Sequence, residues 1–160
     1  YFPHVFIPFS ANLACLVDYF VACLLVVPLS WYYGYSLAWS GFVWFPVLTI
    51  FCLFFAFSVS LILSSLNVAY RDVSHLIPFG IQLWMFSTPI LYPLASVPER
   101  LQPLVKLNPM VAVVETFRAS FFGYPIPFHL WGPAVLMAMV LFILGAWFFS
   151  RQQKQLADVI

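Results

Sequence analysis

Long stretches without a charged residue constrain this chain more than any other feature. Residues 19–70 contain no Asp, Glu, Lys or Arg, and neither do residues 73–98 or 119–150. A helix needs about 20 apolar residues to cross a bilayer, so the first stretch is long enough for two crossings and each of the others for one. With 64% hydrophobic and only 7% charged residues, the chain lacks the composition for a water-solvated surface. The sequence therefore predicts a multi-pass membrane protein.

The expected fold is all-α, with four transmembrane helices. They are predicted at about residues 8–31, 41–66, 74–92 and 128–149. The segment before the last helix is too charged and too rich in proline for another crossing, yet too apolar for an ordinary loop. We expect a pair of short re-entrant helices there, at about residues 97–122.

Capping residues give the bounds of this re-entrant pair. Ser96 and Glu99 form a capping-box pattern around Pro98, which predicts a first helix that ends near Lys106. Asn108 as N-cap with Pro109 in the first turn predicts a second helix, and Gly123 is expected to terminate it. Glu115 and Arg118 are three residues apart on that helix, the spacing of an ion pair. The alternative is a surface helix with a solvated pair.

Asp18 is the only ionisable residue well inside a predicted span. It is expected near the middle of the bilayer, where a carboxylate facing lipid is unfavourable. One interpretation is a polar contact on a transport path or a proton-coupling group. The other is a protonated or hydrogen-bonded residue at a helix interface, because it shares a stripe of small side chains with Ala11, Cys15 and Ala22.

Aromatic residues make up 21% of the chain and admit two interpretations. They could face lipid, form interfacial belts or pack in the core. They could instead line a path for a polysaccharide, since aromatic faces offer broad surfaces to the C–H faces of sugar rings. The candidates for such a path, together with one polar residue, are Phe51, Phe54, Phe55, Gln82, Trp84, Phe86 and Tyr92.

The sequence lacks the motifs of common enzyme active sites. It contains no G-x-S-x-G, H-E-x-x-H or paired-cysteine motif, and its three histidines, His4, His75 and His129, are far apart. We therefore expect no catalytic residues and no metal. A net charge of +1 argues against nucleic-acid binding. No glycine-rich phosphate loop is present, so energy from ATP would have to come from a partner subunit.

Several separated motifs resemble one family. They are the runs NVAYRDV (67–73), QLW (82–84), STPILYP (87–93), VPE (97–99) and LNP (107–109). In order and spacing they resemble the permease of bacterial type-2 ABC exporters of polysaccharides such as O-antigen, capsular polysaccharide and teichoic acid.

The resemblance implies a transport subunit in the bacterial inner membrane rather than an enzyme. Family members have six spans, so this chain would supply the third to sixth. It would act as a homodimer with an ATPase subunit that carries ATP and Mg²⁺, on a lipid-linked glycan. The ATPase-contact candidates are Asn67, Tyr70, Arg71 and Asp72, and the exit-gate candidates are Asn108, Pro109, Glu115 and Arg118.

Two other functions remain open from the residues alone. A permease for a small lipid or a drug could be built on the same architecture, and would differ in pore width and aromatic lining. An intramembrane enzyme acting on lipid-linked sugars would need Asp18, Glu115 and the histidines to converge.

Overall fold

The computed structural model describes residues 6–70 and 72–157, with side chains over 9–70 and 72–152. All regular elements in these ranges are helical. In chain order they are α1 (Phe6–Tyr32), α2 (Trp39–Ala69), α3 (Val73–Ser87), η1 (Leu94–Ser96), α4 (Gln102–Lys106), α5 (Pro109–Phe122), η2 (Phe128–Leu130) and α6 (Trp131–Ala157). The prediction of an all-α protein is confirmed.

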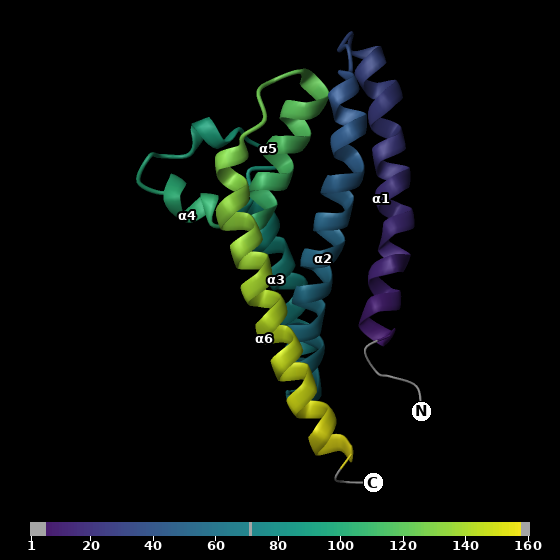
Figure 1. Ribbon diagram of the computed structural model, residues 1–160, viewed down its shortest axis with the longest axis vertical. Helices are drawn as coiled ribbons and strands as arrows, with labels where there is room; N and C mark the ends of the chain where they lie inside the picture. Colours follow the sequence, from purple (N-terminus) through teal and green to yellow (C-terminus); the bar gives the residue numbers. More distant parts are fainter. Residues whose placement is uncertain (1–5, 71, 158–160) are drawn as a thin grey trace.

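Three helical segments are long and apolar enough to cross a membrane. They are Phe9–Tyr32, Trp39–Ala69 and Phe128–Gln152, which lie at the predicted first, second and fourth spans. In Figure 1 the corresponding helices α1, α2 and α6 run along the long axis of the molecule. Many of their large apolar side chains are exposed, as is expected where lipid rather than water is the solvent.

The third predicted span is represented by a shorter helix. α3 has 15 residues and ends at Ser87 rather than near Tyr92. Pro89 explains the early end, because a proline disfavours helical backbone in the residue before it. Thr88 is accordingly extended, with φ −91° and ψ 132°. At about 1.5 Å per residue, α3 is roughly 22 Å long and is shorter than a full crossing.

The predicted start of the first re-entrant helix is wrong. α4 begins at Gln102 instead of near Pro98, and its N-cap Leu101 makes no side-chain cap bond, so Ser96 and Glu99 do not form the expected capping box. Pro103 is the reason, because its ring would clash with the carbonyl of residue 99 inside a longer helix. It is tolerated in the first turn of α4. The predicted end at Lys106 is confirmed.

The second short helix has the predicted bounds. Asn108 caps the N-terminus of α5, and its side chain accepts a hydrogen bond from the Met110 amide. Gly123 ends the helix in the left-handed conformation, with φ 75°, which a residue with a Cβ rarely adopts.

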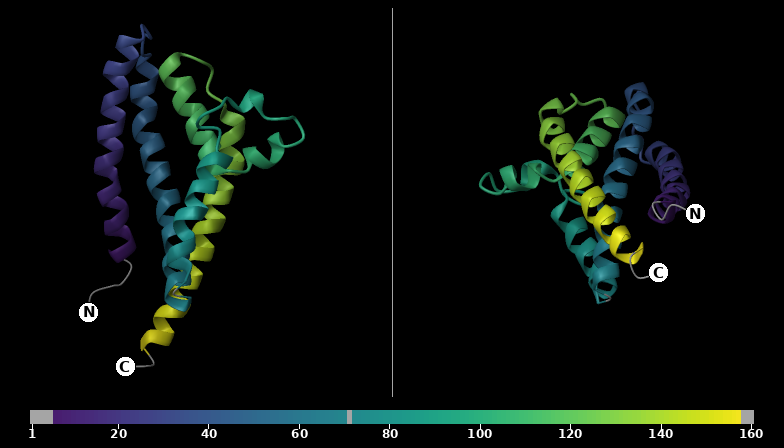
Figure 2. Two further views of the ribbon diagram at one scale, coloured as in Figure 1. Left: turned by 180° about the vertical axis from the view of Figure 1, so that it is seen from behind. Right: turned by 60° about the horizontal axis from the view of Figure 1, so that its bottom comes forward.

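α2 is the central helix of the bundle. α6 packs closely on it where Gly145 meets the backbone of Ser58, and α5 packs on its beginning where Gly41 meets the ring of Phe121. α3 contacts the second half of α2, where the rings of Phe55 and Trp84 are 5.8 Å apart. α1 and α4 lie at opposite edges of the bundle (Figure 2).

A small buried core joins α5 to the start of α6. It consists of Val111, Ala112, Leu130 and Ala134, with Phe51, Leu94 and Val105 packed against it. The indole nitrogen of Trp131 donates a hydrogen bond to the hydroxyl of Thr116 at 3.0 Å. Thr116 is fully buried, so this bond satisfies a polar pair inside the core.

Candidate functional site

The end of α3 and the beginning of α5 meet through Asn108. Its side-chain nitrogen donates to the hydroxyl of Thr88 at 2.8 Å, while its side-chain oxygen accepts from the Met110 amide at 3.1 Å. The Thr88 hydroxyl in turn donates to the Trp84 carbonyl at 2.9 Å. One amide side chain therefore caps α5 and ties it to the last turn of α3.

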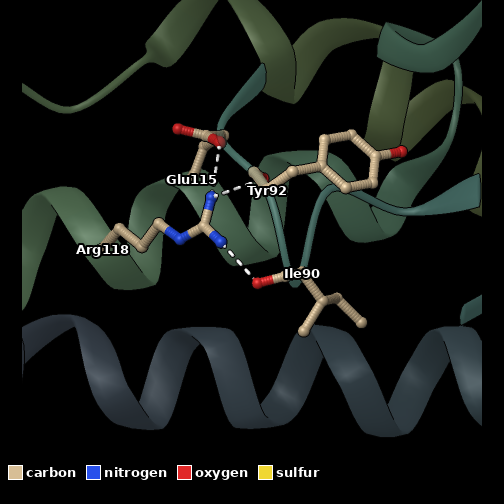
Figure 3. Close-up of polar contacts among 4 residues, drawn as sticks. All are labelled: Ile90, Tyr92, Glu115 and Arg118. Atoms are coloured by element: carbon tan, nitrogen blue, oxygen red, sulfur yellow. Dashed lines mark hydrogen bonds and ion pairs between the residues drawn. The ribbon is translucent and has the colours of Figure 1, made fainter. Parts of the chain in front are cut away.

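Arg118 makes a second connection between α5 and the segment after α3. Its guanidinium donates to the carbonyl of Ile90 at 2.6 Å and to that of Tyr92 at 3.4 Å. It also forms the predicted ion pair with Glu115, at 3.1 Å. Figure 3 shows the guanidinium between these three acceptors. The guanidinium thus provides hydrogen-bond donors to two backbone carbonyls in the segment after α3, which lacks the regular hydrogen bonds of a helix.

Prolines lie on both sides of this junction. Pro89 follows Thr88 and Pro109 follows Asn108, and Thr88 and both prolines are fully buried. A proline contributes no N–H, so the backbone needs fewer hydrogen-bond acceptors at a point where two helices are interrupted. The arrangement fixes the path of the chain between α3 and α5.

A cavity of about 570 Å³ opens beside the junction. Its lining is Ser87, Tyr92, Ser96, Val97, Pro98, Leu101, Leu104, Val105 and Asn108. The hydroxyl of Tyr92 donates to the Phe86 carbonyl at 3.1 Å, which holds this side chain at the wall. No charged residue lines the cavity.

The exit-gate candidates are brought together at this site. Asn108 and Pro109 form the start of α5, and Glu115 and Arg118 lie two to three turns further along it. Whether these residues form a gate stays a prediction.

The path candidates separate into two groups. On α2, Phe51 packs edge-on against Trp131, Phe54 packs against Phe142, and Phe55 is buried against Trp84. These three side chains hold α2 to its neighbours within this chain.

On α3, Gln82, Trp84 and Phe86 are exposed, and Tyr92, just after the helix, is half-buried. α3 has no buried residue. Apart from the contact between Trp84 and Phe55, the second group therefore presents a surface that other parts of the described chain leave largely uncovered. Participation of either group in a transport path stays a prediction.

The ATPase-contact candidates lie at the turn between α2 and α3. Asn67 is in the last turn of α2, Tyr70 is its C-cap and Asp72 precedes α3, and all three are exposed. Arg71 lies outside the described residues. The turn is at the opposite end of α2 from the C-terminus of α5 (Figure 1).

Asp18 is exposed on α1 and forms no hydrogen bond or ion pair with any residue that the structure describes. The other members of its stripe, Ala11, Cys15 and Ala22, are exposed as well. α1 meets α2 through a different face, where Asn12 bonds Ser60 at 3.0 Å. The stripe therefore faces away from α2, and its packing against another helix stays a prediction.

In the part of the chain that the structure describes, no three His, Cys, Asp or Glu side chains gather as a metal site would require. Asp18 on α1 and Glu115 on α5 lie on helices separated by α2 (Figure 1). His4 lies outside the described residues. The convergence that an intramembrane enzyme would need is not formed by Asp18 and Glu115.

Two features of the site were missed in the sequence. Thr88 was not singled out, although helices commonly end at or before the residue that precedes a proline. The bonds from Arg118 to the Ile90 and Tyr92 carbonyls have no sequence signal, because backbone acceptors are present at every position.

Three long apolar helices, with shorter helices beside them, define a multi-pass α-helical membrane protein. The chain belongs to the ABC-2 type transporter family, whose model matches residues 3–122.

Curated relatives carry a more specific name. The O-antigen export system permease protein RfbA of Myxococcus xanthus is 29% identical over 157 residues, which are 96% of this chain and 60% of the relative. Two proteins of the same name from Klebsiella pneumoniae are 25% and 26% identical, each over 99% of this chain and 61% of the relative. The chain thus spans about 60% of the length of the curated relatives it matches.

Proposed function

We propose that this chain is part of the permease subunit of an ATP-driven exporter that moves a lipid-linked polysaccharide, of the O-antigen or capsule kind, across the bacterial inner membrane. The observation that carries the proposal is the similarity to three O-antigen export permeases along nearly the whole chain. Membership of the ABC-2 type transporter family supports it.

The proposed partner for energy is a separate ATPase subunit that binds ATP and Mg²⁺. The exposed residues Asn67, Tyr70 and Asp72 would face this subunit, and Arg71 is proposed to act with them. Nucleotide binding to the ATPase subunit would favour one arrangement of α2 and α3 over another, because a partner shifts a conformational equilibrium by binding one state more tightly. The permease itself is proposed to be a transport subunit without catalytic residues.

The proposed assembly contains two copies of the permease around a common pore. α3 supports this, since it has no buried residue and exposes Trp84 and Phe86. In a dimer that apolar face would lie toward the second copy or the pore. A lipid-linked glycan would then pass along the exposed aromatic side chains.

The proposed topology has four crossings and a re-entrant pair. α3 and the extended segment after it would make the third crossing, and α4 and α5 would enter from the exit side and return. The position of α5 beside the first half of α2 supports this, because a helix in that position lies at the same depth as a predicted span.

Deletion of the full-length gene tests the function. The deletion strain is expected to lose surface glycan on gels and to accumulate lipid-linked polymer inside the cell. Complementation with the wild-type gene should restore the surface glycan, and an Arg71→Ala variant should restore it less completely at equal protein level. Normal surface glycan without internal polymer would contradict the proposal and favour a small-lipid or drug permease.

A further inference from the structure

The contacts that α3 and α5 make along α2 give the depth of the junction between them. The last turn of α5 contacts α2 at Gly41 through Phe121, and the last turn of α3 contacts it at Phe55 through Trp84. Gly41 and Phe55 are 14 residues apart, which corresponds to about 21 Å along a helix. α3 and α5 therefore occupy successive halves of the length of α2, as Figure 1 also shows.

Exposed aromatic side chains mark the end of α2 next to Gly41. Trp31, Tyr32, Tyr33, Tyr35 and Trp39 are between 61% and 86% exposed. Tryptophan and tyrosine gather at the level of the lipid headgroups, where one part of the ring system is apolar and the other wet.

This aromatic end is tied directly to the C-terminus of α5. The Ala38 amide donates to the Phe121 carbonyl at 2.9 Å, and the rings of Tyr35 and Phe122 are 5.5 Å apart. With the aromatic residues at the headgroup level, the beginning of α5 lies about 21 Å deeper. The hydrocarbon core is about 30 Å thick, so the junction and its cavity are within the membrane region.

The lining of the cavity selects a class of ligand. Four of the lining residues, Ser87, Tyr92, Ser96 and Asn108, carry hydroxyl or amide groups, and the others are aliphatic. Tyr92 and Asn108 already bond Phe86, Thr88 and Met110, so hydrogen bonding to a ligand would fall mainly to the hydroxyls of Ser87 and Ser96. No cation is part of the lining: Arg100, between Pro98 and Leu101, is exposed and lies outside it, Lys106 donates to the Gln102 side chain, and Arg118 donates to backbone carbonyls. Neutral hydrogen-bonding groups beside an apolar wall suit an uncharged ligand with hydroxyl groups and C–H faces, rather than a phosphate.

We propose that this cavity binds an uncharged saccharide unit of the glycan during its passage. The inference rests on the proposed function and adds to it a specific site at the interruption between α3 and α5. Its volume of about 570 Å³ lies within the roughly 300–1,000 Å³ of small-molecule sites. The junction lies between two partial helices at membrane depth, where irregular backbone is tolerated if it lines a cavity.

Protection of an introduced cysteine tests the site. The full-length permease would be produced with its ATPase subunit, with every cysteine, Cys15, Cys23 and Cys52 among them, replaced by alanine and Ser96→Cys added. Membranes would be treated with vanadate to stall transport and labelled with a small maleimide, in a strain that makes the glycan and in one that cannot. Glycan should slow labelling at position 96 roughly fivefold, as for a ligand present at about four times its dissociation constant.

A Ser36→Cys variant is the matched control, since Ser36 is an exposed serine in the α1–α2 connection outside the cavity. Its labelling should be the same in both strains. Ser87→Cys provides a second position in the cavity should the Ser96→Cys protein not accumulate, and it should also be protected.

Two results would overturn the proposal. Equal, fast labelling in both strains would show a cavity without glycan, and equal, slow labelling in both would show one filled by lipid. The amount of surface glycan in the strain with the cysteine-free permease would also be measured, because it tests the proposed function separately from the site. If that strain exports glycan while position 96 is not protected, the function holds and the site is wrong.

Discussion

The guanidinium of Arg118 lies 2.6 Å from the carbonyl oxygen of Ile90, 28 residues earlier in the chain. The same side chain bonds Tyr92 and Glu115, so α5 holds the irregular segment that follows α3. With Asn108 bonded to Thr88, this gives two attachments between α3 and α5. A movement of α3 would be transmitted to α5 through both.

Replacement of Arg118 by alanine should loosen the segment after α3. The carbonyls of Ile90 and Tyr92 would lose a charged donor, which corresponds to about 1–3 kcal/mol of stability. We expect a lower thermal midpoint for the purified full-length permease and faster proteolysis between residues 88 and 101. Arg118→Lys should recover part of the loss, because one ammonium group reaches one acceptor at a time.

Glu115→Gln separates the ion pair from the carbonyl bonds. Partly exposed ion pairs contribute only about 0–1 kcal/mol, so this variant should have a midpoint close to the wild type. An equal loss in Glu115→Gln and Arg118→Ala would contradict the assignment of the main role to the carbonyls.

Asn108 should show two separable contributions. Asn108→Ser keeps a capping oxygen for the Met110 amide but is too short to bridge to Thr88, whereas Asn108→Ala loses both bonds. We expect stability losses of about 1 kcal/mol for serine and about 2 kcal/mol for alanine, from thermal midpoints measured side by side. Equal losses would show that the bond to Thr88 contributes nothing.

The contact between α2 and α6 depends on Gly145. A Cβ at this position would be 2.9 Å from the Ser58 carbonyl oxygen and 3.0 Å from the Leu61 Cβ. Gly145→Ala should therefore force the two helices apart and lower the amount of folded protein in the membrane.

Gly132→Ala on the same helix is the control, since a Cβ there meets no atom within 4 Å. It should leave the protein level unchanged, as measured by immunoblot of membranes and by size-exclusion chromatography. Comparable losses in both variants would contradict the role of the contact with Ser58, since alanine is the better helix former and does not by itself lower the protein level.

Aromatic residues on α2 and α3 should respond differently to truncation. Phe54 is half-buried and packs on Phe142, so Phe54→Ala should reduce the protein level by removing a contact between α2 and α6. Phe86 is 54% exposed on α3, so Phe86→Ala should preserve the protein level.

Under the proposed function, Phe86→Ala should lower surface glycan per permease. The measurement is the ratio of surface glycan to membrane-inserted permease for each variant, both normalised to wild type. A normal ratio for Phe86→Ala would contradict a path along this face of α3.

The sequence by itself determined the helices and several of their ends. The length of a stretch without charged residues predicts where apolar helices exist. A charged side chain in lipid is energetically costly, and exposing twenty apolar residues to water is costly too. Asn108, Pro109 and Gly123 set the ends of α5 through local backbone chemistry, which the tertiary structure does not alter. Pro89 and Pro103 carried the same kind of local information, although their effects on α3 and α4 were not anticipated.

Only the tertiary structure decided which faces of the helices meet. Lipid and protein interior are both apolar, so hydrophobicity does not distinguish the packed Phe54 from the exposed Phe86. The bonds from Arg118 to Ile90 and from Asn108 to Thr88 likewise join residues far apart in sequence. They form because α2 aligns α3 and α5 end to end, and that alignment depends on close contacts such as the one at Gly41.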